Sequence, residues 1–167
     1  MTALALSRAE PIGHPLDLAE DVVAGLAGSC ERTGEDELVV ELSGRWSSYQ
    51  LVLHWCADIG FLFATSMLDY KVPRDRRGPF YELLTLANEK MSAGHFDFAT
   101  PEAVPTFRQT LLLRGAGGAT VEQIEDLIDV ALRELDRFYP AFQYVLWGGR
   151  KPADAIAAAM LEPAGEA

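Results

Sequence analysis

The feature that most constrains this chain is a long stretch in which apolar residues recur three or four positions apart, Thr120–Trp147. That spacing places them on one face of a helix, and this face must be buried against the rest of the chain. The residues on it are Val121, Ile124, Ile128, Ala131, Leu135, Phe138 and Phe142. Thr120 and Gln123 form a capping-box pattern at the start, whereas Pro140 predicts a kink or a stop near Tyr139.

The opposite face of this predicted helix carries a stripe of carboxylates, which are Glu122, Glu125, Asp126 and Asp129. Metal-binding helical bundles use carboxylates and Glu-x-x-His pairs that point into the core. No histidine stands beside this stripe in the sequence, and its side chains oppose the apolar face. We therefore expect a solvated surface there and no metal site.

Shorter segments on either side of this helix have the periods of helices and of strands. Helical spacing is found in residues 16–27, 76–92 and 151–161. Strand-like alternation is found in residues 38–42, 49–55, 61–70, 96–100 and 104–114. Strands grouped in this order predict an α+β fold, in which an antiparallel sheet made of a meander plus a hairpin packs with three main helices.

Length and composition predict a single acidic domain. We expect one domain over residues 15–162 of the 167, between a mobile tail of residues 1–14 and a C-terminal tail of residues 163–167. The 25 acidic and 14 basic residues give a net charge of −11, which argues against a general affinity for nucleic acid or anionic membranes. No segment resembles a signal peptide or a membrane span, so we expect a cytoplasmic protein in which Cys30 and Cys56 stay reduced.

The sequence lacks motifs for cofactors and catalysis. The glycine-rich segment 114–120 joins a strand to a helix start, but it lacks the lysine followed by serine or threonine of a Walker loop. The three histidines, His14, His54 and His95, lack the spacing of a zinc site. We therefore expect no metal, no nucleotide cofactor and no enzymatic activity.

Four segments resemble the YbjN-domain family. They are LANEKMSAGHFD at 86–97, FRQTLLLRG at 107–115, DRFYPAFQYVLWGG at 136–149 and KPADAIAAAML at 151–161. The likeness is strongest over residues 70–167, and DRFYPAFQ is its most specific block. The resemblance implies a fold similar to that of the type III secretion chaperones, which work as dimers, and a non-enzymatic role in sensory-transduction regulation. It brings no catalytic or ligand residues to this chain.

A second indication of a homodimer comes from residues 61–70, which are apolar at both alternating sets of positions. One set is Phe61, Phe63 and Met67, and the other is Leu62, Leu68 and Tyr70. Only one set can face the protein's own helices, and the other would form an exposed apolar strip that marks an interaction surface. A second subunit is one cover for that strip. The alternative is a monomer in which helix 16–27 or helix 153–161 crosses the outer side of the sheet.

Basic residues are concentrated just after this strip, where Lys71, Arg74, Arg76 and Arg77 lie within seven positions. A solvated loop would explain them, and so would a contact for an acidic partner segment, such as the acidic helix face of a second copy. The candidate partner-binding residues are therefore Phe61, Phe63, Met67, Arg74, Arg76 and Arg77.

Three functions remain open from the sequence. The leading one is a non-catalytic binding protein, chaperone-like or regulatory, that holds a polypeptide partner. The alternative is a regulator that binds a small ligand in a pocket lined by aromatic residues such as Trp46, Trp55, Phe63 or Tyr139. The third is a hydrolase, which would need a carboxylate beside His54, Cys56 or His95.

Overall fold

The computed structural model describes residues 13–161. Most of the predicted N-terminal tail, and all of the predicted C-terminal tail, therefore lie outside the described residues. The elements follow in the order α1 (Pro15–Gly25), β1 (Ser29–Gly34), β2 (Glu37–Ser43), β3 (Ser48–Cys56), β4 (Phe61–Met67), the 3₁₀ turn η1 (Arg74–Arg76), α2 (Arg77–Asn88), β5 (His95–Ala99), β6 (Val104–Leu112), α3 (Val121–Leu146) and α4 (Pro152–Leu161).

The strands form one six-stranded sheet in which every neighbouring pair is antiparallel. Its order is β1-β2-β3-β4-β6-β5, a meander extended by a hairpin whose second strand pairs with β4. This confirms the predicted α+β fold with an antiparallel sheet.

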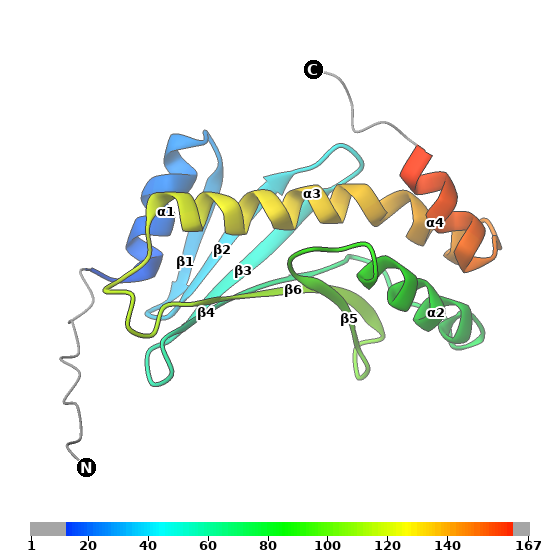
Figure 1. Ribbon diagram of the computed structural model, residues 1–167, viewed down its shortest axis with the longest axis horizontal. Coiled ribbons are helices and arrows are strands. Elements are labelled where there is room, and N and C mark those ends of the chain that lie inside the picture. The colour runs from blue at the N-terminus through cyan, green and yellow to red at the C-terminus, as the bar shows by residue number, and fades with distance from the viewer. Residues whose placement is uncertain (1–12, 162–167) are drawn as a thin grey trace, which may run out of the picture.

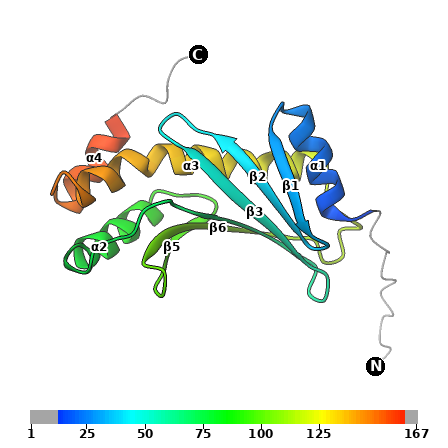
Figure 2. The ribbon, with the colours of Figure 1, turned by 180° about the vertical axis from the view of Figure 1, so that it is seen from behind.

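The helices lie on one side of the sheet (Figure 1). The long helix α3 runs across β3, β4 and β6, and α1 packs beside it over β1, β2 and β3. At the other end, α2 packs on β5, while α4 packs on α2 and α3. Seen from behind, the sheet lies in front of α3 (Figure 2).

The core lies between the sheet and α3, because every second residue of the central strands points toward the helices. Leu38, Leu53 and Ala64 form one such cross-strand row, and all three are buried. Near α2 the core is aromatic, and the rings of Phe96 and Phe142 pack edge to face with centroids 4.9 Å apart.

Helix α3 confirms the predicted capping box, because Thr120 accepts a hydrogen bond from the Gln123 backbone and the Gln123 side chain accepts one from Thr120. The predicted stop near Tyr139 is wrong, since α3 continues through Pro140 to Leu146. Proline removes one backbone hydrogen bond at a cost of about 3 kcal/mol or more. Tertiary packing outweighs that cost here, because the residues that follow Pro140 are buried against the sheet and α2.

The edge strand β1 is not among the predicted strands. Its sequence, SCERTG, has no apolar alternation, and Cys30 and Arg32 occupy the positions that face α1. An edge strand paired on one side only can form with such polar residues, provided that a helix supplies partners for them. Here α1 supplies Asp17 and Glu20.

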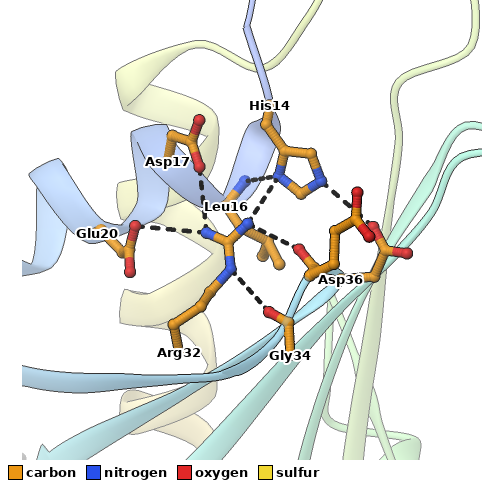
Figure 3. Close-up of polar contacts among 8 residues, drawn as sticks. His14, Leu16, Asp17, Glu20, Arg32, Gly34 and Asp36 are labelled. Atoms are coloured by element: carbon orange, nitrogen blue, oxygen red, sulfur yellow. Dashed lines mark hydrogen bonds and ion pairs between the residues drawn. The ribbon is translucent and has the colours of Figure 1, made fainter.

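The guanidinium of Arg32 joins α1 to the β1–β2 turn, because its nitrogens contact carboxylates of α1 and carbonyls of the turn (Figure 3). Nη1 lies 3.2 Å from Asp17 Oδ1 and 3.3 Å from Glu20 Oε2. On the turn side, Nε donates to the Gly34 carbonyl at 3.0 Å and Nη2 to the Glu35 carbonyl at 2.7 Å. The guanidinium therefore fixes the orientation of the first helix by hydrogen bonds as well as by charge.

His14 completes this contact as the N-cap of α1, although the sequence placed it in the mobile tail. Its Nδ1 accepts a hydrogen bond from the Leu16 backbone, which leaves the proton on Nε2 to donate to Asp36 Oδ1 at 3.3 Å. The ring also meets Trp55 edge to face, with centroids 6.4 Å apart.

Candidate interaction surfaces

The face of the sheet that points away from the helices is covered by no helix of residues 13–161. We call it the open face. Its apolar side chains are Val39, Val52, Cys56, Phe61, Phe63, Met67 and Leu112. Two of them are largely exposed, Met67 at 49% and Leu112 at 62%. An uncovered sheet face that carries several apolar side chains is uncommon on a solvated protein.

The aromatic centre of the open face lies on β4. Phe63 stands between His54 on β3 and Thr110 on β6, and its ring meets that of Phe61 with centroids 6.0 Å apart. Phe61 in turn lies beside Leu112. The apolar part of the face is therefore shared by β3, β4 and β6.

The half of the open face formed by β1 and β2 is acidic. Glu37 and Glu41 point to this side because they alternate with the buried residues of β2, and Glu31 does so as the register partner of Val39. The β5 edge is closer to neutral, since Asp97 and Arg108 pair there at 3.3 Å. A molecule that covers the open face therefore meets apolar side chains next to negative charge.

The structure places the six predicted partner-binding residues in two locations. Phe61, Phe63 and Met67 share the open face, as the alternation predicts. Arg74 and Arg76 lie in η1, and Arg77 begins α2 with its guanidinium over the ring of Phe98, 5.7 Å from the centroid. Phe98 alternates with Asp97 and points to the helix side, so the arginines belong to a separate surface.

The predicted alternative cover for the strip, a short helix that crosses the outer side of the sheet, is wrong for the described residues. Helix α1 packs against α3, and α4 packs against α2 and α3, so both lie on the covered side. The physical reason is that α3 alone is too narrow to cover six strands. The short helices fill the space on either side of it.

The edge of the sheet at β5 is closed by side chains. Asn88, at the end of α2, donates to the Phe96 carbonyl at 2.9 Å and accepts from the Phe96 backbone N–H at 2.7 Å. The Phe98 N–H donates to Asp97 Oδ1 at 2.7 Å. These are the groups that an added strand would need, so a partner cannot extend the sheet at β5.

The block DRFYPAFQ forms a corner between α3 and the β2–β3 turn. Asp136 accepts hydrogen bonds from the Arg45 backbone at 2.9 and 3.0 Å and from the Tyr49 hydroxyl at 2.9 Å. A side chain on Gly44 would clash with this carboxylate and with the Tyr49 ring, which explains the glycine. The predicted burial of Phe142 is confirmed, and Tyr139 is half-buried.

Two buried tyrosine hydroxyls beside the corner differ in whether they have a hydrogen-bond partner. Burial, followed by the hydrogen bond to Asp136, raises the pKa of Tyr49 far above its ordinary value. Burial, followed by the neighbouring Tyr139, raises the pKa of Tyr70 as well, but the Tyr70 hydroxyl is buried without a hydrogen-bond partner in the described chain.

The model of the family described as "Putative bacterial sensory transduction regulator" matches residues 15–144. The chain belongs to the YbjN family. Among solved structures, it is similar to one described as "Crystal structure of YbjN, a putative transcription regulator from E. coli", at 14% identity and a TM-score of 0.53. That similarity covers 72% of this chain and 85% of the other and shows a shared fold. No curated protein matches the chain.

The YbjN match begins at α1 and includes all six strands, so the open face and the Asp136 corner both lie inside the family region. Helix α4 lies beyond it. The most specific block recognised in the sequence therefore has a structural role, because Asp136 joins the long helix to the sheet.

The catalytic group that the hydrolase hypothesis requires is not formed within residues 13–161. His54, Cys56 and His95 make no hydrogen bond to one another or to a carboxylate there, so the arrangement required for the hydrolase hypothesis is missing. Residues 13–161 contain no group of three His, Cys, Asp or Glu side chains that could hold a metal ion. None of the helices in this part of the chain is long and apolar enough to cross a membrane. Cys30 and Cys56 are free thiols on opposite faces of the sheet.

The aromatic residues proposed to line a pocket do not gather. Trp55 points to the helix side beside His14, whereas Phe63 points to the open face. Trp46 lies in the β2–β3 turn under Arg45, and Tyr139 packs against Tyr49.

Sequence reasoning missed Leu112, the most exposed apolar residue of the open face. The signal was present, because Leu112 is out of phase with Phe107, Leu111 and Leu113, which point to the helices. Strands β4 and β6 each carry apolar residues on both faces of the sheet, and the two strands lie side by side.

Proposed function

We propose that this protein is a non-catalytic regulator that binds a polypeptide partner on the open face of its sheet. The regulatory role follows the family description. The observation that supports polypeptide binding is the apolar group of exposed Met67 and Leu112 and half-buried Phe61 and Phe63, which no described element covers.

The composition of the open face favours an amphipathic partner segment. Apolar side chains on β4 and β6 offer area for hydrophobic contact. The carboxylates Glu31, Glu37 and Glu41 beside them favour basic residues in the partner, because opposite charges fix the register of a complex. Docking on the face is also favoured over strand addition at β5, since Asn88 closes that edge.

We also propose that two copies cover this face for each other in the absence of a partner, giving a homodimer. Each exposes the same apolar group, and self-complementary patches of this kind form two-fold dimers. The dimer would have twice the mass of the 18.3 kDa chain. Partner binding would then compete with self-association.

Light scattering coupled to size exclusion tests the dimer. Phe63→Glu places a charge at the centre of the apolar group and is expected to convert the dimer to a monomer. Leu26→Glu is the matched control, since Leu26 is 52% exposed and lies just after α1, away from the open face. A wild-type monomer, or equal masses for both variants, would contradict this part of the proposal.

Partner binding has its own test. Proteins captured by the wild type are identified and purified, and their affinity is then measured for the wild type, Phe63→Glu and Leu26→Glu. We expect at least a tenfold loss, about 1.4 kcal/mol, for Phe63→Glu alone. A purified partner that binds all three equally would place its site elsewhere.

A further inference from the structure

Positive charge is concentrated where α2 and α4 begin. We call this surface the basic end, and it consists of Lys71, Arg74, Arg76, Arg77, Arg150 and Lys151. These are six of the 14 basic residues of a chain with 25 acidic ones. Most of the remaining surface is therefore negative.

Two segments far apart in the sequence build the basic end. The rings of Tyr70 and Trp147 meet edge to face at 5.2 Å, which joins the chain after β4 to the end of α3. A side-chain carbon on Gly149 would lie 3.9 Å from Arg76 Nη1, so the α3–α4 connection adjoins η1. Figure 1 shows both segments at the same end of the molecule.

These charges are largely unneutralised. The one carboxylate within ion-pair distance in the described chain is Asp75, whose Oδ2 lies 3.9 Å from Arg76 Nε, with both side chains exposed. Elsewhere, Arg32, Arg108 and Arg137 each pair with a carboxylate at 3.2 or 3.3 Å. Like charges held together repel, and a bound anionic group relieves that repulsion.

An aromatic side chain stands among the charges. Trp147 is 61% exposed, although its ring rests on Tyr70. The Arg150 guanidinium lies over Tyr144, 4.4 Å from the ring centroid. An exposed tryptophan beside arginines is typical of the residues that carry binding energy in protein interfaces.

We propose that the basic end binds an acidic stretch of a partner polypeptide. Arginine guanidinium groups pair with its carboxylates, and an apolar side chain of the same stretch packs on Trp147. A long nucleic acid fits less well, because it would continue from this small patch onto negatively charged surface. The site is separate from the open face, so it stands or falls independently of the proposed function.

Fluorescence anisotropy with a labelled peptide of alternating glutamate and leucine tests this site in the full chain. We compare the wild type with Lys71→Ala/Arg74→Ala/Lys151→Ala, which removes three exposed charges with no ion-pair partner within residues 13–161. The control, Lys90→Ala/Arg114→Ala/Arg133→Ala, removes three exposed charges elsewhere and has the same net charge.

We expect the basic-end variant to weaken peptide binding about tenfold, because it removes three ion pairs with the peptide, each of which contributes modestly at an exposed site. The control is expected to bind within about twofold of the wild type. Trp147→Ala is expected to weaken peptide binding relative to the wild type, and Trp147→Phe is expected to bind like the wild type. Thermal melts show that both variants fold. A glutamine version of the peptide is expected not to bind.

Four results would overturn the proposal. The peptide could fail to bind, or it could bind both triple variants equally. A single-stranded oligonucleotide of the same charge could bind more tightly than the peptide, which would assign the surface to nucleic acid. A dimer that dissociates only in the basic-end variant would assign it to a second copy of this chain.

Discussion

The two ends of this molecule handle positive charge in opposite ways. At the α1 end, Arg32 is enclosed by two carboxylates and two backbone carbonyls, and it holds helix and turn together. At the basic end, Arg74 has no such partner among the described residues, Arg76 has only Asp75 at 3.9 Å, and Arg77 has only the Val72 carbonyl at 3.5 Å. The difference teaches that a charge satisfied inside the fold stabilises the fold, whereas a charge left unsatisfied is available to a partner.

The largest expected effect tests whether the core is equally well packed beneath both ends of the molecule. Phe142 packs against Phe80 and Phe96 beneath the basic end, and Leu16 is buried beneath α1. Phe142→Ala is expected to lower the free energy of unfolding by about 3–5 kcal/mol and Leu16→Ala by about 2–5 kcal/mol. Urea melts measure both. A loss below about 1 kcal/mol for Phe142→Ala would show that the basic end is loosely packed, and the two ends would then differ in more than charge.

A medium effect tests the contrast between the arginines themselves. Arg32→Ala leaves Asp17, Glu20 and two carbonyls without their partner, so we expect a loss of about 1–3 kcal/mol in the free energy of unfolding. Arg74→Ala, at an exposed site, is expected to change it by less than about 0.5 kcal/mol. Equal effects in chemical denaturation would remove the distinction between the two ends.

The smallest expected effects concern two tyrosine hydroxyls. Tyr49→Phe removes a hydrogen bond to Asp136 and is expected to cost about 1–2 kcal/mol of stability at neutral pH. Tyr70→Phe removes a buried hydroxyl without a partner in the described chain, so it is expected to be neutral or to stabilise by up to about 1 kcal/mol. A clear destabilisation by Tyr70→Phe would reveal a hydrogen bond at that hydroxyl.

The same two variants have a pH signature. The pKa of each tyrosine is raised in the folded state, mainly by burial, above an ordinary value of about 10. Below about pH 10 both states keep the proton and the contribution to stability is complete. Above it the unfolded chain ionises first and binds fewer protons, so stability falls as pH rises. Each phenylalanine variant should reduce this alkaline loss relative to the wild type in urea melts at increasing pH.

Periodicity predicted the parts of the fold that depend on local pattern. The apolar stripe of α3, its capping box and the alternation of β2, β3 and β4 all follow from residues close together in sequence. The two phases of β4 also predicted that Phe61 and Phe63 would share a face. Their partner remains a proposal.

Long-range contacts could not be predicted in the same way. Arg45 and Asp136 lie 91 positions apart, and the pairing of Asn88 with Phe96 depends on how α2 packs on the sheet. The polar strand β1 forms because β2 and α1 are already beside it. In each case the side chain acquires its role from a neighbour that the local pattern does not specify.

The Asn88 amide has a consequence for how large an assembly this chain can build. Growth of a sheet from molecule to molecule needs two available edges, one to receive a strand and one to offer it. Of the two edges that the described sheet has, β5 is occupied by Asn88 and β1 is the one that remains. Even if two copies paired through β1, a third would find no edge on which to continue, so main-chain pairing would terminate instead of propagating.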